Sequence, residues 1–64
     1  MIALYYDTEL EVNVEAQQYL GLSGPMYYMG AIIYVNDTDW LVQYPNHKIT
    51  AYSNDIFVQR FTAV

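Results

Sequence analysis

Polar and apolar residues alternate along residues 7–16 of this chain. The alternation has the period of two that is typical of a β-strand with one face on a core. A helix would spread the same acidic residues around its circumference. The segment therefore predicts a strand whose inward positions are Leu10, Val12, Val14 and Ala16. The outward positions are Asp7, Glu9, Glu11, Asn13 and Glu15.

The segments on either side of this strand have other patterns. Residues 1–6 are apolar and aromatic, and they predict a first strand or the start of one long strand bent near Asp7. Residues 21–25 contain glycine, serine and proline, which indicates a loop. Residues 26–35 are apolar on both faces, which predicts a strand covered on both sides, with a bulge or bend at Gly30.

The C-terminal half predicts a hairpin and an edge strand. Residues 36–39 are a cluster of turn formers, and residues 40–44 follow as a strand. Proline and asparagine at residues 45–46 are typical of the centre of a second turn. Residues 48–52 are the returning strand, and residues 62–64 close the chain as an edge strand.

A short helix is predicted between these strands. Ser53 or Asn54 can cap a helix that begins at Asp55, and an aspartate in the first turn suits the positive end of the helix dipole. Phe57 and Phe61 are four residues apart and therefore share one helix face. We expect that face to pack on the sheet.

Length and composition limit the fold and the kinds of site. The 64 residues allow one domain, residues 1–64. We predict a mainly β fold: a small antiparallel sheet or SH3-like curled barrel of about four to five strands, plus one short C-terminal helix. Without cysteine, and with His47 as the single histidine, the chain has no disulfide framework or multi-histidine metal centre. The net charge of −5 argues against direct nucleic-acid binding, and no membrane-spanning or signal segment is recognised.

Tyrosine is unusually abundant. Eight tyrosines, one tryptophan and two phenylalanines exceed what a core of this size needs. A chain this short is marginally stable alone, and it has no disulfide to support it. Because tyrosine buries a large ring and keeps a polar tip, we predict a homo-oligomer, most simply a dimer.

Two segments carry a resemblance. Residues 14–19 read V-E-A-Q-Q-Y, and residues 39–64 contain D-W-L-V, then D-I-F, and end in F-T-A-V. Together they resemble a family of small bacteriophage and prophage proteins with a V-E-A-x-Q-W/Y strand and a block G-D-W/Y-I/V-V … D-I/V-F-x-x-x-Y/F-x-x-V. This chain has Thr38 and His47 where that family has glycine, and a short loop in place of a helix after the first strand. The resemblance implies phage origin, a shared fold and the host bacterial cytoplasm, and it carries over no catalytic residue.

Catalytic and metal chemistry have few candidates. Ser23 and Ser53 could act as nucleophiles only beside a base, and His47 lies in a predicted tight turn. Residues 36–39 offer oxygen ligands but lack the glycine and the distant glutamate of a calcium loop. We therefore expect no enzyme activity, no cofactor and no metal.

Charge and aromatic content favour binding instead. Carboxylates on one strand face repeat every 6.6–6.8 Å or so and can match a basic surface, as a row of phosphates does. Aromatic residues are enriched at interface hot spots. Together with the resemblance, this predicts an accessory protein that binds and inhibits a host or anti-phage defence protein. The expected partner-binding residues are Asp7, Glu9, Glu11, Glu15, Tyr27 and Tyr28.

Two alternatives remain open. The chain could be an oligomeric sponge that holds a nucleotide signal between tyrosine rings, with cations on the phosphates. It could instead be a structural or assembly module of the virion. The residues for the nucleotide alternative are Tyr44, Lys48, Tyr52 and Arg60.

Overall fold

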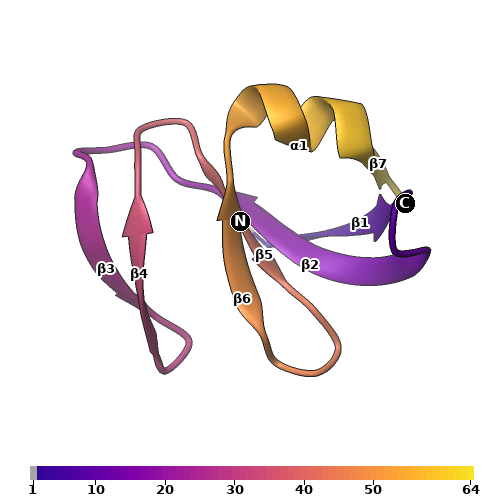
Figure 1. The fold of residues 1–64 in the computed structure, drawn as a ribbon, viewed down its shortest axis with the longest axis horizontal. Helices are drawn as coiled ribbons and strands as arrows, with labels where there is room; N and C mark the ends of the chain where they lie inside the picture. Colours follow the sequence, from indigo (N-terminus) through magenta and orange to yellow (C-terminus); the bar gives the residue numbers. More distant parts are fainter. Residues whose placement is uncertain (1) are drawn as a thin grey trace.

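The computed structural model describes residues 2–64 and consists mainly of antiparallel strands (Figure 1). One short helix precedes the last strand. The mainly β class with a short C-terminal helix is therefore confirmed, with more strands than the sequence suggested. The elements are β1 (Ala3–Asp7), β2 (Val12–Gln18), β3 (Gly24–Tyr28), β4 (Ala31–Val35), β5 (Trp40–Gln43), β6 (Ile49–Tyr52), α1 (Asn54–Arg60) and β7 (Phe61–Ala63).

The main sheet has five strands in the order β6-β5-β2-β1-β7, all antiparallel to their neighbours. The predicted hairpin over residues 40–52 is confirmed as β5 and β6. The predicted edge strand near the C-terminus is confirmed as β7, which pairs with β1. Strand β2 lies at the centre because it pairs with β1 on one side and β5 on the other.

The single strand predicted over residues 7–16 is wrong. Asp7 ends β1, residues 8–11 form a turn, and β2 begins at Val12. The turn forms because the Asp7 carboxylate accepts the N–H groups of Glu9 and Leu10, which competes with continued strand pairing. Of the predicted inward positions, Val14 and Ala16 are buried, Val12 is half-buried and Leu10 is exposed in the turn.

The core lies between α1 and one face of the main sheet. Val14, Ala16, Val42, Phe57 and Phe61 form its buried cluster. The predicted short helix is confirmed: Ser53 is the N-cap, and its side chain accepts the N–H of Ile56 at 3.3 Å. The helix ends at Arg60, so Phe61, which was expected on the same helix face as Phe57, begins β7 instead. Partly buried side chains complete the cluster, namely Tyr5, Val12, Trp40, Tyr44 and Tyr52.

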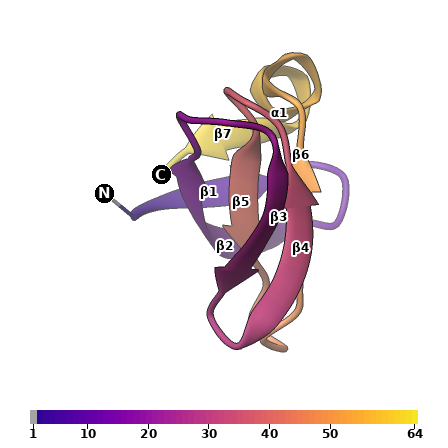
Figure 2. The same cartoon turned by 90° about the vertical axis from the view of Figure 1, so that its left-hand side faces the viewer.

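Strands β3 and β4 form a separate two-stranded sheet (Figure 2). They were predicted as one strand, residues 26–35. The chain instead reverses at Met29 and Gly30, whose φ angles of 52° and 84° suit a two-residue hairpin turn. The bend expected at Gly30 is thus confirmed as a complete reversal.

The hairpin covers the side of the main sheet that faces away from α1. β4 lies beside β6 in both views (Figures 1 and 2). Val35 and Leu41 are buried there, since Leu41 points away from the α1 side of β5. The other face of the hairpin stays exposed, so the expectation of cover on both sides does not hold within one chain.

Thr38 has an unusual backbone conformation, with φ at 71°. A β-branched residue is strained in this left-handed region by about 1–2 kcal/mol, whereas glycine adopts it freely. We expect Thr38→Gly to raise the free energy of unfolding by about 0.5 kcal/mol, after the extra chain entropy of glycine is offset. Urea denaturation measures this change. The matched control is Thr62→Gly in β7, which should lower stability, and an equal loss in both variants would contradict the strain at Thr38.

Candidate functional site

Asp7 is the most deeply buried charged side chain among residues 2–64, with no exposed surface. Arg60 binds it bidentately: Nε donates to Oδ1 and Nη2 to Oδ2, each at 2.9 Å. The Tyr44 hydroxyl also donates to Oδ2, at 2.9 Å. The backbone N–H groups of Glu9 and Leu10 donate to Oδ1 at 2.9 and 3.2 Å. Every lone pair of this carboxylate therefore has a donor, which is what a buried charge requires.

The network extends to a second tyrosine. The hydroxyls of Tyr44 and Tyr52 lie 2.8 Å apart. Because Tyr44 donates its one proton to Asp7, Tyr52 is the donor in this pair. The Arg60 guanidinium also lies 5.1 Å from the centre of the Tyr52 ring. Four side chains from β1, the β5–β6 hairpin and α1 are thus fixed together.

The electrostatics of this network follow from its geometry. Hydrogen bonds from Arg60 hold the pKa of Asp7 well below its usual range. The same contact with Asp7 raises the pKa of Arg60. Burial raises the pKa of the Tyr44 hydroxyl. At neutral pH the carboxylate and guanidinium are therefore ionised and the Tyr44 phenol is neutral.

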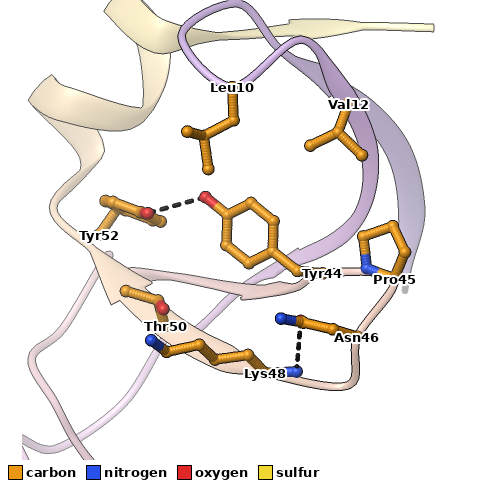
Figure 3. A pocket seen from close by; sticks show the side chains of 8 residues that line it. All are labelled: Leu10, Val12, Tyr44, Pro45, Asn46, Lys48, Thr50 and Tyr52. Carbon is orange, nitrogen blue, oxygen red and sulfur yellow. Dashed lines mark hydrogen bonds between the residues drawn. The ribbon is translucent and has the colours of Figure 1, made fainter.

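A hollow of about 480 Å³ lies above this network (Figure 3). One wall is formed by Leu10 and Val12, and the other by the turn at residues 44–48 together with Thr50 and Tyr52 of β6. Inside the hollow the hydroxyls of Tyr44 and Tyr52 form a hydrogen bond with each other. The Leu10 side chain extends toward these two rings from the opposite wall (Figure 3). The lining residues are Leu10, Val12, Tyr44, Pro45, Asn46, Lys48, Thr50 and Tyr52.

Lys48 lines the hollow, and two carboxylates stand next to its lining residue Leu10 in the chain. We call residues 8–11 the acidic turn, because Glu9 and Glu11 are exposed there on either side of Leu10. The Glu9 side chain is 69 % exposed, and its Oε1 lies 3.8 Å from Nη1 of Arg60. Lys48 is exposed on the opposite wall. The hollow itself is thus lined by Leu10, two phenol groups and Lys48, and the exposed Glu9 and Glu11 adjoin Leu10 in the chain.

The predicted partner-binding residues are not brought together. Asp7 is buried in the ion pair with Arg60 and presents no surface. Glu9 and Glu11 lie in the acidic turn, and Glu15 is exposed on β2. The expected acidic strand face is therefore wrong, because the chain turns after Asp7 instead of continuing as a strand.

The two tyrosines of that set also lie apart. Tyr27 is 74 % exposed on β3. Tyr28 points the other way and is half-buried. Burial, followed by the nearby charge of Glu15, raises the pKa of Tyr28. Only Tyr27 is therefore placed as an exposed interface residue would be.

The residues of the nucleotide alternative do converge. Tyr44, Lys48 and Tyr52 all line the hollow. Arg60 lies behind them, but its guanidinium is occupied by Asp7 and is not free for a phosphate. Lys48 is thus the one cation among these residues that faces the hollow without a carboxylate partner.

Sequence reasoning missed the apolar walls of the hollow. Leu10 was assigned to the core, and Val12, Pro45 and Thr50 were not considered as site residues. The available signal was Asp7 itself, because aspartate side chains favour Asx turns, and such a turn would have placed Leu10 at the surface.

The other residues considered for catalysis or metal binding have structural roles. The Ser53 hydroxyl caps α1, and His47 lies in the β5–β6 turn with φ at 68°. Asp37 and Asp39 accept hydrogen bonds from the backbone N–H groups of Gly21 and Asn36. No cluster of three or more potential metal ligands occurs within residues 2–64. None of the helical residues in that range forms a segment with the length and apolarity that crossing a membrane requires.

Comparisons with protein-family models, with curated proteins and with solved structures find no match to this chain.

Proposed function

We propose that this chain is a non-enzymatic accessory protein of phage type that binds, and thereby inhibits, a host or defence protein with a basic surface. The surface that supports this best is the hollow together with the acidic turn. The observation that carries the proposal is the hollow of about 480 Å³, with phenol groups inside, whose lining residue Leu10 stands in the chain between the exposed Glu9 and Glu11.

An anchor side chain from the partner suits this hollow. Interface hot spots are well-packed aromatic pockets that lose their water on binding, and Tyr44 and Tyr52 are held in place by their hydrogen bonds. A site fixed in advance lowers the cost of ordering side chains on association. We therefore expect an apolar or aromatic side chain of the partner to lie between Leu10 and the tyrosines.

The acidic turn supplies charge complementarity. Glu9 and Glu11 flank Leu10, so lysine or arginine residues around the partner's anchor would meet carboxylates on both sides. Opposite charges at the rim of an interface accelerate association and set orientation. The net charge of −5 adds long-range attraction for a basic surface.

The backbone supports the phage-family resemblance. Thr38 and His47 stand where that family has glycine, and both adopt positive φ, at 71° and 68°. Glycine is the residue that such positions favour. The alignment of these two turns with the family is therefore physically consistent, and we extend it to a phage accessory role.

Charge reversal in the acidic turn tests the proposal. The tagged chain is used to capture proteins from bacterial host lysate at low salt. We expect Glu9→Lys to weaken binding of the captured protein about tenfold, because a rim carboxylate becomes a like charge facing a basic partner. Glu15→Lys is the matched control, since Glu15 is also exposed but lies on β2 away from the hollow.

Two outcomes would contradict the proposal. One is the absence of any protein captured by the wild-type chain at low salt. The other is equal retention of the captured protein by Glu9→Lys and Glu15→Lys. Circular dichroism of each variant establishes that the fold is kept.

The nucleotide sponge is a second candidate, because Tyr44, Lys48 and Tyr52 line one hollow. Calorimetry with a panel of cyclic and linear nucleotides tests it. Heat that disappears in Lys48→Ala would support it over protein binding, and no heat across the panel would remove it.

A further inference from the structure

The hairpin β3–β4 has an exposed face made of four side chains, Pro25, Tyr27, Ile32 and Tyr34, which we call the hairpin face. Tyr27 and Ile32 are each 74 % exposed, and Tyr34 is 65 % exposed. Met29 at the turn and Leu20 and Leu22 in the preceding loop are exposed as well. The four paired positions of the hairpin face form a contiguous apolar surface, which usually marks an interaction site.

The hairpin face carries no charge. Residues 16–36 contain no aspartate, glutamate, lysine or arginine, although the whole chain has a net charge of −5. A partner attracted by this negative charge would bind where carboxylates are exposed, and the hairpin face has no carboxylate. Two copies of this chain repel wherever their carboxylates approach, so an uncharged face is where they can meet.

The pattern of large and small side chains on the hairpin face is self-complementary. Pro25 lies opposite Tyr34, and Tyr27 lies opposite Ile32, so the two tyrosines occupy one diagonal. Two such faces can stack about a two-fold axis that lies between them and runs either along or across the strands. In both arrangements each tyrosine of one copy contacts a smaller side chain of the other copy. A two-fold interface of this kind uses the same patch on both subunits.

The edge of β3 is poorly suited to the alternative of strand addition. Tyr28 and Ala31 close the two-residue turn as a hydrogen-bonded pair, so Pro25 falls at a non-hydrogen-bonded position where an N–H would point outward. Proline has no such donor, and proline at an edge prevents further pairing. The face of the hairpin, not its edge, is therefore the available surface.

The exposed area is sufficient for a dimer. The hairpin face and Met29 together expose on the order of 600 Å², about the lower limit of what each partner contributes to a standard interface. A two-stranded hairpin alone is only marginally stable in water, and this one is covered on a single face. We propose that a second copy of this chain packs on the hairpin face, which makes the protein a two-fold homodimer.

Sedimentation equilibrium of the purified chain over a range of concentrations tests the dimer. We expect the mass to reach twice the chain mass of 7.5 kDa, with a dissociation constant at or below the micromolar range. Ile32→Lys should return the mass to that of one chain at the same concentrations, because it places two lysines in an apolar interface. The matched control is Val58→Lys on α1, which is 62 % exposed and outside the hairpin face, and which should stay dimeric.

Each other result would overturn the inference. A wild-type chain that stays monomeric at about 100 µM lacks the affinity of a standard interface. A dimer that persists in Ile32→Lys, or that Val58→Lys dissociates equally, places the contact elsewhere. Glu9→Lys should leave the mass unchanged, so failure of the proposed partner binding and failure of the dimer can be told apart.

Discussion

Replacing Asp7 with asparagine should lower the free energy of unfolding by about 3 kcal/mol or more, which is the usual cost of removing one partner of a buried ion pair. The substitution keeps the shape of the side chain but leaves the Arg60 guanidinium without its counter-charge. If the amide nitrogen takes the place of Oδ2, a donor stands where the carboxylate oxygen accepts hydrogen bonds from Arg60 and Tyr44. A domain of this length has roughly 3–10 kcal/mol of stability in total, so the variant should keep its fold with a much smaller margin.

Urea denaturation measures this loss, and Glu15→Gln is its matched control. Glu15 is an exposed glutamate on β2, and its amide replacement should change stability by no more than about 0.5 kcal/mol. Equal stability of the two variants would contradict a structural role for the Asp7 ion pair.

The same ion pair makes stability depend on pH. The pKa of Asp7 is depressed in the folded chain, so its contribution is complete above the unfolded pKa, near 3.9, and is lost as pH falls below that value toward the folded pKa. Wild type should therefore lose stability below about pH 4. Asp7→Asn should show a smaller loss in this range, because it has no carboxylate to protonate at this position.

The C-terminal half was predictable from sequence because its signals are local. Turn residues bound each strand of the β5–β6 hairpin, and Ser53 stands next to the first turn of α1. The spacing of Phe57 and Phe61 predicted that both rings share a helix face; Phe61 instead begins β7, yet the two rings are stacked with centroids 4.7 Å apart. Such features depend on a few residues that are neighbours in the sequence, so they can be predicted from the sequence pattern.

The site could not be predicted in the same way because it depends on distant residues. Alternation continues through residues 7–16 even though the chain turns there. The Asp7 side chain forms the turn through local hydrogen bonds, but its burial depends on Arg60, which is 53 residues away in sequence. The pattern treats an aspartate as a solvent-facing residue, so it predicted an acidic strand where the structure has an ion pair and the wall of a hollow.

The hairpin β3–β4 was missed for a different reason. An uninterrupted apolar run does not reveal where it is bent, and the turn here uses Met29 before Gly30 in place of the usual Asn-Gly. The prediction of cover on both faces came from the apolar pattern alone. Within one chain only the inner face is covered, and the proposed dimer would cover the other.

Phe57→Ala should have the second large effect on stability. The Phe57 ring is buried at the centre of an aromatic cluster: it stacks on Trp40 with centroids 4.0 Å apart and meets Tyr5 edge-on at 5.0 Å. Truncating a buried phenylalanine costs about 3–5 kcal/mol, from lost burial and the cavity left behind. In so small a domain this loss removes a large share of the total stability and should lower the urea midpoint sharply.

The neighbouring residue provides the control for this prediction. Val58 is exposed on the same helix, and Val58→Ala should stay within about 0.5 kcal/mol of wild type. Phe57→Leu should keep most of the burial and fold, yet it should lose the near-ultraviolet circular dichroism that arises from the stacked Trp40 ring. If Phe57→Ala unfolds at the same urea concentration as Val58→Ala, α1 does not pack on the sheet through this ring. The core that supports both the hollow and the hairpin would then have to be built from other contacts.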